Sequence, residues 1–150
     1  MELSVSRFES LQVQELYQIL QLREKVFVLE QECLYQDLDD LDQPSWHVML
    51  KDGDKLVACA RVFHRNKEQH VAQIGRMVTA MEYRRLAKGT EVMRKSMDVA
   101  FNELDAQEIY IEAQVYAIPF YENLGFTVSS EEFLEDGIPH VQMIAKRQER

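Results

Sequence analysis

Residues 74–104, IGRMVTAMEYRRLAKGTEVMRKSMDVAFNEL, join an apolar segment to a long periodic one through a compact polar loop. We predict a strand from His70 to Thr79, in which the internal Gly75 indicates a bulge or a close backbone approach. From Lys88 to Leu104, apolar residues recur at steps of three and four and charged residues occupy the opposite face, which is typical of an amphipathic helix. This strand–loop–helix unit is the part of the chain on which both the fold and the chemistry depend.

The segments on either side of this unit predict further elements in an alternating order. Before it we expect a strand at 3–8, a helix that follows Ser10, an acidic connection over 34–44, and strands at 46–50 and 55–64 joined by a turn at Asp52-Gly53. After it we expect strands at 109–113, 126–129 and 141–145, and a short helix over 118–124 that ends at Gly125. Helices that alternate with strands in the second half favour an α/β layered fold in a single domain, 1–150.

The composition is that of a globular domain and narrows the class of function. The chain is 46% hydrophobic and 29% charged, with three prolines and five glycines, which argues against disorder and fibrous repeats. A formal net charge of −9 argues against a general affinity for nucleic acids or anionic membranes. No apolar run is long enough to cross a bilayer, the first residues lack a signal-peptide core, and the two cysteines show no CxxC spacing. We therefore expect a reduced, cytoplasmic protein.

The polar loop before the long helix has the chemistry of an anion site. A helix start exposes about four unpaired backbone N–H groups and carries roughly half a positive charge. Small residues at Ala87 and Gly89 leave that backbone accessible, and Arg84, Arg85 and Lys88 add formal charge. The loop matches neither the GxxxxGK[ST] nor the GxGxxG phosphate motif. On these grounds alone, the loop favours a solvated basic helix cap, with phosphate binding as the alternative.

Two motifs in this half of the chain resemble the GNAT family of N-acetyltransferases. Arg84-x-x-Ala87-x-Gly89 is similar to the family's [Q/R]-x-x-[G/A]-x-[G/A] pyrophosphate-binding motif and lies, as in the family, between a strand and a helix. Residues 117–126, AIPFYENLGF, resemble its A-x-x-F-Y-x-x-x-G-F segment. Residues 22–31 (LREKVFVLEQ) and 135–143 (EDGIPHVQM) resemble the ElaA/YjcF-like subgroup. The resemblance covers nearly the whole chain, although Arg85 and Ala87 replace glycines that are common in the loop.

The resemblance implies a GNAT acyl-CoA N-acyltransferase fold, with a central, mostly antiparallel mixed sheet flanked by helices. It implies acetyl-CoA as cosubstrate, a primary amine of a small molecule or peptide as acceptor, and direct transfer in a ternary complex. The coenzyme-binding residues that it implies are Met77, Val78, Thr79, Arg84, Arg85, Leu86, Ala87, Lys88, Gly89, Thr90, Gln114 and Phe120. The histidines, the cysteines and the acidic cluster at 37–42 lack the ligand spacing of a metal site, so we expect no metal. Dimers are common in the family.

Acetylation of an amine needs donors for the carbonyl oxygen, an acid for the leaving thiolate and a base for the amine. The resemblance places the thioester carbonyl at the backbone N–H of Met77, in a strand whose neighbour has splayed away, and assigns the general acid to Tyr121. A phenol stays protonated at neutral pH and can donate to a thiolate. For the base, His140 is the first candidate, because histidine side chains titrate near neutral pH; Glu30 and His47 are alternatives.

Other charged groups allow two interpretations. Glu30 lies seven residues after Arg23 on the same side of the first predicted helix, so the two could pair or line an acceptor pocket. The acidic cluster at 37–42 favours a solvated loop, with attraction of a cationic acceptor as the lesser alternative, and it lacks the ligand spacing of an EF-hand. A non-catalytic acyl-CoA-binding or regulatory module with the same fold is the alternative to an enzyme.

Overall fold

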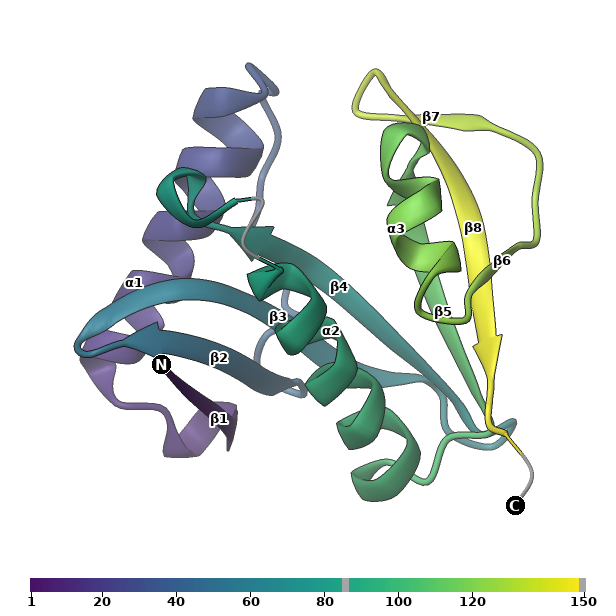
Figure 1. Cartoon of the computed structure of the whole chain (residues 1–150), viewed down its shortest axis with the longest axis horizontal. Coiled ribbons are helices and arrows are strands. Elements are labelled where there is room, and N and C mark those ends of the chain that lie inside the picture. Colours follow the sequence, from purple (N-terminus) through teal and green to yellow (C-terminus); the bar gives the residue numbers. More distant parts are fainter. Residues whose placement is uncertain (85–86, 149–150) are drawn as a thin grey trace.

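The computed structural model describes residues 1–84 and 87–148, and its centre is one mixed sheet (Figure 1). The strands are β1 (Glu2–Arg7), β2 (Trp46–Asp52), β3 (Lys55–Asn66), β4 (Val71–Thr79), β5 (Glu108–Gln114), β6 (Thr127–Val128), β7 (Phe133–Glu135) and β8 (Ile138–Lys146). They follow the order β1-β2-β3-β4-β5-β8-β6, and β7 also pairs with β8. β4 and β5 run parallel, whereas the other paired strands run antiparallel. The expected mostly antiparallel mixed sheet is confirmed.

Helices cover both faces of the sheet (Figure 1). α1 (Val13–Arg23) continues as a π-helical segment, Glu24–Glu30, and α2 (Lys88–Asp98) continues in the same way through Val99–Glu103. α3 (Ile118–Glu122) is shorter and has a proline in its first turn. The amphipathic helix expected to start at Lys88 is therefore confirmed. Within the described ranges, no helix has the length and apolarity to span a membrane.

Each face of the sheet packs against its own apolar cluster. The larger one packs Val92 and Met93 of α2 in the same core as Val48 of β2. The smaller one packs Ile19 of α1 in the same core as Met49 of β2. Because successive strand residues point to opposite faces, the neighbours Val48 and Met49 belong to different clusters. The strand pattern therefore places α1 and α2 on opposite sides of the sheet.

Two elements differ from what the sequence predicted. Ser10 lies in a 3-10 turn, and Gln12 caps α1 instead, with its backbone N–H donating to Oε1 of Glu15 at 2.8 Å in a capping box. β7 was not predicted, and it pairs with β8 through a turn at Asp136 and Gly137, whose φ angles are 51° and 78°. An Asp-Gly turn with two positive φ angles is a strong hairpin signal. The signal for β7 was therefore present in the chain.

The parallel pair β4–β5 separates soon after it forms. Residues 71–73 of β4 pair with residues 108–110 of β5, and beyond them the two strands share no register. The splay implied by the family resemblance is therefore present, and it opens the sheet along its middle (Figure 1).

A bulge bends β4 within this opening. Arg61 of β3 pairs with Gly75, and the next pair along β4 is Val78 with Cys59, so β4 carries one more residue than β3 here. Arg76 takes a left-handed φ of 49°. The expected bulge beside Gly75 is confirmed, but the left-handed backbone is at Arg76, because the extra residue of the bulge follows the glycine.

Candidate active site

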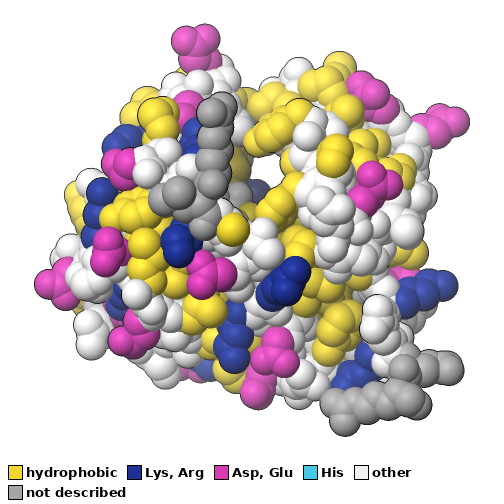
Figure 2. All heavy atoms as spheres, in the orientation of Figure 1, with side chains coloured by type: hydrophobic (Ala, Val, Ile, Leu, Met, Phe, Trp, Pro, Cys, Tyr) yellow, Lys and Arg dark blue, Asp and Glu magenta, His cyan; other side chains and the backbone are white. Residues whose placement is uncertain are grey.

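A cavity of about 910 Å³ occupies the opening between β4 and β5. Figure 2 shows the molecule hollowed between the β4 side and the β5–β8 side. The walls come from α2 and α3 on one face of the sheet, and from the segment after α1 on the other. The lining includes these expected residues: Glu30, Met77, Val78, Thr79, Arg84, Ala87, Lys88, Gly89, Thr90, Gln114, Phe120, Tyr121 and His140. Arg85 and Leu86, which were also expected, lie outside the described residues.

The N-terminus of α2 forms one end of the cavity. Its N-cap residue, Ala87, has a left-handed φ of 58°, and its methyl group offers no acceptor to the first amides of the helix. A Cβ atom at Gly89 would lie 3.3 Å from Cε of Met77, 3.5 Å from Oγ1 of Thr79 and 3.7 Å from Cζ of Phe120. Glycine therefore lets the first turn of α2 pack closely against β4 and α3, with the positive end of the helix at the cavity.

Arg84, the first residue of the loop motif, is paired with Glu30 from the end of the α1 extension. Its Nη1 and Nη2 atoms each donate to one carboxylate oxygen of Glu30 at 2.8 Å, and its Nε donates to the Thr79 carbonyl at 3.2 Å. The hydrogen bonds from Arg84 lower the pKa of Glu30, and the pKa of Arg84 is raised in return. Glu30 therefore pairs with the loop and not with Arg23, which was the pairing considered from the sequence.

Tyr121 lines the cavity among aromatic side chains of its own segment. Its ring centroid lies 5.0 Å from that of Phe120 and 6.0 Å from that of Phe126, and both pairs meet edge to face. Burial raises the pKa of the Tyr121 phenol to about 12. The hydroxyl group is therefore protonated across the physiological range and available as a proton donor.

His140 of β8 lies beside Gln114 of β5, and 8% of its surface is exposed. Its Nδ1 atom lies 2.7 Å from the carbonyl oxygen of Ile138, which assigns the proton of the neutral ring to Nδ1 and the lone pair to Nε2. Phe133 stacks on the ring at 6.0 Å, and Nε2 lies 3.5 Å from Oε2 of Glu135. The ring is thus held on one side, and its Nε2 atom can share a proton with a neighbouring group.

Carboxylates surround His140 on the cavity wall. Glu112, Glu135 and Asp136 line the cavity, and within the described part of the chain no lysine or arginine forms an ion pair with them. Burial, and then the negative charge of Glu135, raises the pKa of Glu112. The described arginines of the wall are neutralised by other carboxylates; they are Arg61, Arg76 and Arg84. This side of the cavity is therefore negative.

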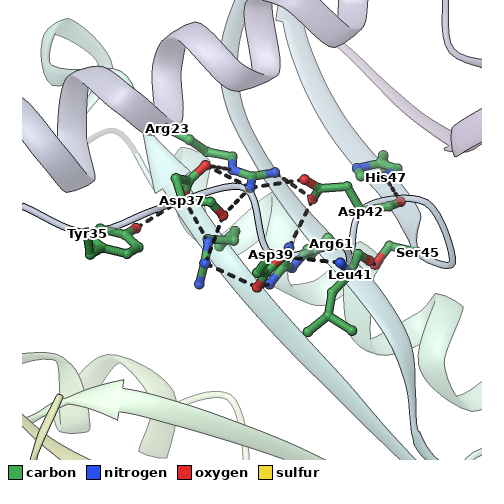
Figure 3. Close-up of polar contacts among 10 residues, drawn as sticks. Arg23, Tyr35, Asp37, Asp39, Leu41, Asp42, Ser45, His47 and Arg61 are labelled. Carbon is green, nitrogen blue, oxygen red and sulfur yellow. Dashed lines mark hydrogen bonds and ion pairs between the residues drawn. The ribbon is translucent and has the colours of Figure 1, made fainter. Parts of the chain in front are cut away.

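The acidic cluster at 37–42 is not the solvated loop that the sequence favoured. Arginines from α1, β3 and β4 enter it and form an arginine–aspartate network (Figure 3). Its hydrogen bonds include Arg23 Nη1 to Asp42 Oδ1 (2.7 Å), Arg23 Nε to Asp37 Oδ2 (2.8 Å), Arg61 Nη2 to Asp39 Oδ2 (2.6 Å), Arg76 Nε to Asp37 Oδ1 (2.8 Å) and Arg76 Nη2 to Asp39 Oδ2 (3.2 Å). The loop is ion-paired because buried guanidinium groups need counter-charges.

Two further expectations concern residues outside the cavity. His47 is 2% exposed and does not line the cavity; its Nε2 atom bonds to the carbonyl oxygen of Asp42 at 2.8 Å. Among residues 1–84 and 87–148, no group of three or more His, Cys, Asp or Glu side chains is arranged to hold a metal ion.

Glu112, which lines the cavity, was not predicted from the sequence. The signal that could have found it is a single acidic residue within an apolar strand.

Comparisons with known proteins agree on one family. Residues 9–147 match the family model described as an acetyltransferase (GNAT) domain. Protein ElaA of Escherichia coli is 36% identical over 135 residues, which cover 89% of this chain and 88% of that protein. The uncharacterized N-acetyltransferase YjcF of Bacillus subtilis is 35% identical over 125 residues, covering 82% of this chain and 86% of that protein.

Solved structures agree with the sequence relatives. The crystal structure of Escherichia coli ElaA superposes with a TM-score of 0.91 at 33% identity, covering 97% of this chain and 99% of that one. An acyl-CoA N-acyltransferase from Pseudomonas aeruginosa superposes with a TM-score of 0.88, also at 33% identity and with the same coverage. The resemblance read from the two motifs, and the fold that it implied, are confirmed.

Proposed function

The chain belongs to the GNAT acetyltransferase family, and on that premise we propose that it moves an acetyl group from acetyl-CoA to a primary amine. The observation that carries the proposal is the opening between β4 and β5, because the N-terminus of α2, Tyr121 and His140 all line its cavity. A cavity of about 910 Å³ can hold a thioester and an amine together. Direct transfer in a ternary complex then needs no covalent enzyme intermediate.

The diphosphate of the coenzyme is assigned to the N-terminus of α2. The first amides of this helix and its dipole favour an anion at Lys88, Gly89 and Thr90, all of which line the cavity. Arg84 is already paired with Glu30, so the backbone amides carry more of this contact than its guanidinium group does. Phe120 and Tyr121 also line the cavity, and in this proposal the thiol arm of the coenzyme runs along them.

Residues of the cavity account for both protons that the reaction moves, one taken from the amine and one given to the thiolate. The amine nitrogen attacks the carbonyl carbon of the thioester, so that a C–N bond forms and the C–S bond breaks. In this proposal the Met77 N–H donates to the carbonyl oxygen, His140 Nε2 takes the proton released by the amine, and Tyr121 gives the proton taken up by the thiolate. Glu30 is the weaker base of the two candidates on the wall, because Arg84 lowers its pKa.

The acceptor is proposed to be a cationic amine of a small molecule or a peptide. Glu112, Glu135 and Asp136 line the cavity, and none of the described lysines and arginines forms an ion pair with them. A second positive group on the acceptor would be attracted there, whereas a carboxylate would be repelled.

The charge preference can be measured with three amines of equal length. For 1,4-diaminobutane, butylamine and 4-aminobutanoate, we expect kcat/KM to fall in that order, with at least about a tenfold difference between the first and the last. The readout is release of the CoA thiol from acetyl-CoA. Equal kcat/KM values for the three amines would remove the cationic preference while leaving acetyl transfer intact.

Binding of the coenzyme tests the proposed function itself. We expect calorimetry to detect acetyl-CoA binding to the wild-type chain, and Gly89→Val to weaken it at least about tenfold, since a branched side chain forces the first turn of α2 away from β4. Gly89→Ala should be intermediate, because the flexible end of Met77 can move aside. No binding by a folded wild-type chain would refute the proposal, and binding with thermal stabilisation but no turnover on any amine would favour the non-catalytic module.

Replacing His140 tests the base. In His140→Asn, an amide N–H can keep the hydrogen bond to the Ile138 carbonyl while the Nε2 atom is lost. We expect kcat/KM at neutral pH to fall roughly 10- to 100-fold, and the decline of kcat/KM toward acidic pH to disappear, because a base must be unprotonated to act. Glu30→Gln is the comparison variant, for which this acidic decline should persist. An acidic decline that is unchanged in His140→Asn would exclude His140.

A further inference from the structure

The bulge of β4 places a strained residue directly before the amide assigned to the thioester carbonyl. Arg76 has a φ of 49°, a conformation that L-residues with a Cβ atom adopt only at a cost in free energy. Met77 follows it, lines the cavity, and has no partner in the registers of β4 with β3 or with β5. The direction of the Met77 N–H depends on the peptide plane between the two residues, and therefore on the backbone angles of Arg76. Whatever holds Arg76 also aims this amide.

Asp39 links β3 to the bulged part of β4 through one arginine from each strand. Its carboxylate accepts two hydrogen bonds from the Arg61 guanidinium group, Nη1 to Oδ1 at 2.7 Å and Nη2 to Oδ2 at 2.6 Å. The same Oδ2 atom accepts a third from Nη2 of Arg76 at 3.2 Å. Arg61 pairs with Gly75, at the residue before the bulge, and Arg76 is the left-handed residue within it. Figure 3 shows Asp39 beside Arg61.

Further hydrogen bonds hold Asp39 and its partner Arg76 in place. Asp37 accepts from Nε of Arg76 at 2.8 Å and also from Arg23, whose side chain is 1% exposed. The backbone N–H of Leu41 donates to Oδ1 of Asp39 at 3.2 Å, which closes a local turn. A guanidinium group held by two carboxylates cannot rotate freely, so the backbone that carries it is held as well.

We propose that Asp39 is a positioning residue for acetyl transfer, which clamps Arg61 and Arg76 across the β4 bulge and thereby aims the Met77 amide at the thioester carbonyl. The inference rests on the proposed function. Asp39 acts through Arg76 on the direction of a donor, so it affects the rate of transfer more than the affinity for the coenzyme. A donor that is displaced in the transition state loses most of its effect.

Asp39→Asn tests the clamp, and Asp40→Asn is the matched control, because Asp40 is an exposed neighbour with the same change of charge. We expect kcat of Asp39→Asn to fall about 10- to 100-fold while the Kd for acetyl-CoA stays within about threefold of wild type. Asp40→Asn should leave both values unchanged. A kcat for Asp39→Asn equal to that of Asp40→Asn, or a parallel loss of coenzyme binding, would overturn the proposal.

Arg76 offers a second test that separates the clamp from general stability. Arg76→Ala removes the guanidinium group but keeps a Cβ atom at φ 49°, whereas Arg76→Gly removes the group and accepts that φ without strain. We expect Arg76→Gly to retain at least about fivefold more kcat than Arg76→Ala, because glycine adopts the left-handed φ without the cost that alanine has there. Equal kcat values, or a lower kcat for the glycine variant, would contradict a role in holding the backbone.

Hydrogen exchange separates this inference from the proposed function. In the chain without coenzyme, exchange of the amides in residues 74–79 should be faster in Asp39→Asn than in Asp40→Asn, with the other strands unaffected. Unchanged exchange there, in a chain whose wild type binds and turns over acetyl-CoA, would refute the clamp alone. A wild type that neither binds nor turns over acetyl-CoA would refute the proposed function, and with it the catalytic role of Asp39.

Discussion

Replacing Tyr121 by phenylalanine will lower kcat by about 100- to 1,000-fold and leave the Kd for acetyl-CoA within about threefold of wild type. In the proposed function, the Tyr121 phenol, which lines the cavity, protonates the leaving thiolate. Burial raises its pKa to about 12, so the proton stays in place until the thiolate forms. Phenylalanine keeps the edge-to-face contacts with Phe120 and Phe126 and removes the hydroxyl oxygen alone. The effect should therefore fall on the chemical step.

Tyr116→Phe is the matched control for this prediction. Tyr116 also lines the cavity, but it is 79% exposed, so the same loss of one oxygen should leave kcat unchanged. Both variants are measured by thiol release at saturating acetyl-CoA, with binding followed by calorimetry. Turnover of Tyr121→Phe at the rate of Tyr116→Phe would remove the acid role from Tyr121.

Arg23→Met should lower the free energy of unfolding by about 3–5 kcal/mol, because it leaves the three aspartates of the arginine–aspartate network with two arginines, so that one buried negative charge is uncompensated. Arg23 is 1% exposed and donates to Asp42 at 2.7 Å and to Asp37 at 2.8 Å. Methionine fills much of the same volume, so the loss reports on charge more than on a cavity. Denaturant unfolding measures it, and Arg94→Met, at an exposed position of α2, should change the free energy by less than about 0.5 kcal/mol.

The same network makes the free energy of unfolding depend on pH in the acidic range. Hydrogen bonds from arginines outweigh burial and hold the pKa of Asp39 at about 2, and the pKa of Asp42 is also lowered. A carboxyl group whose folded-state pKa is lowered stabilises the fold above its unfolded-state pKa, about 4, and this contribution is lost as the pH falls toward 2. The wild type should therefore lose stability between about pH 5 and 2, and Arg23→Met should lose less over that range. Equal stability of wild type and Arg23→Met at pH 7 would contradict this account.

Much of the site could be predicted from short stretches of the chain. The loop before α2 and the segment around Tyr121 carry recognisable spacing, because a helix start and a tight turn each need particular residues at fixed separations. The bulge in β4 could be anticipated from Gly75, although not its left-handed residue. The role of the acidic loop was predicted wrongly, since its arginine partners are distributed over three separate elements.

Two short motifs were sufficient for the family, and the mostly antiparallel sheet followed from that resemblance. Hydrophobic period predicted the helix that begins at Lys88, because this pattern acts over a few residues. The pairing of Glu30 with Arg84, and of Asp39 with Arg61 and Arg76, depended on the folded chain. These contacts join residues that are far apart in sequence, and ion pairing over such separations follows from how the strands and helices pack. The carboxylates beside His140 and the backbone conformation of Arg76 belong to that second group.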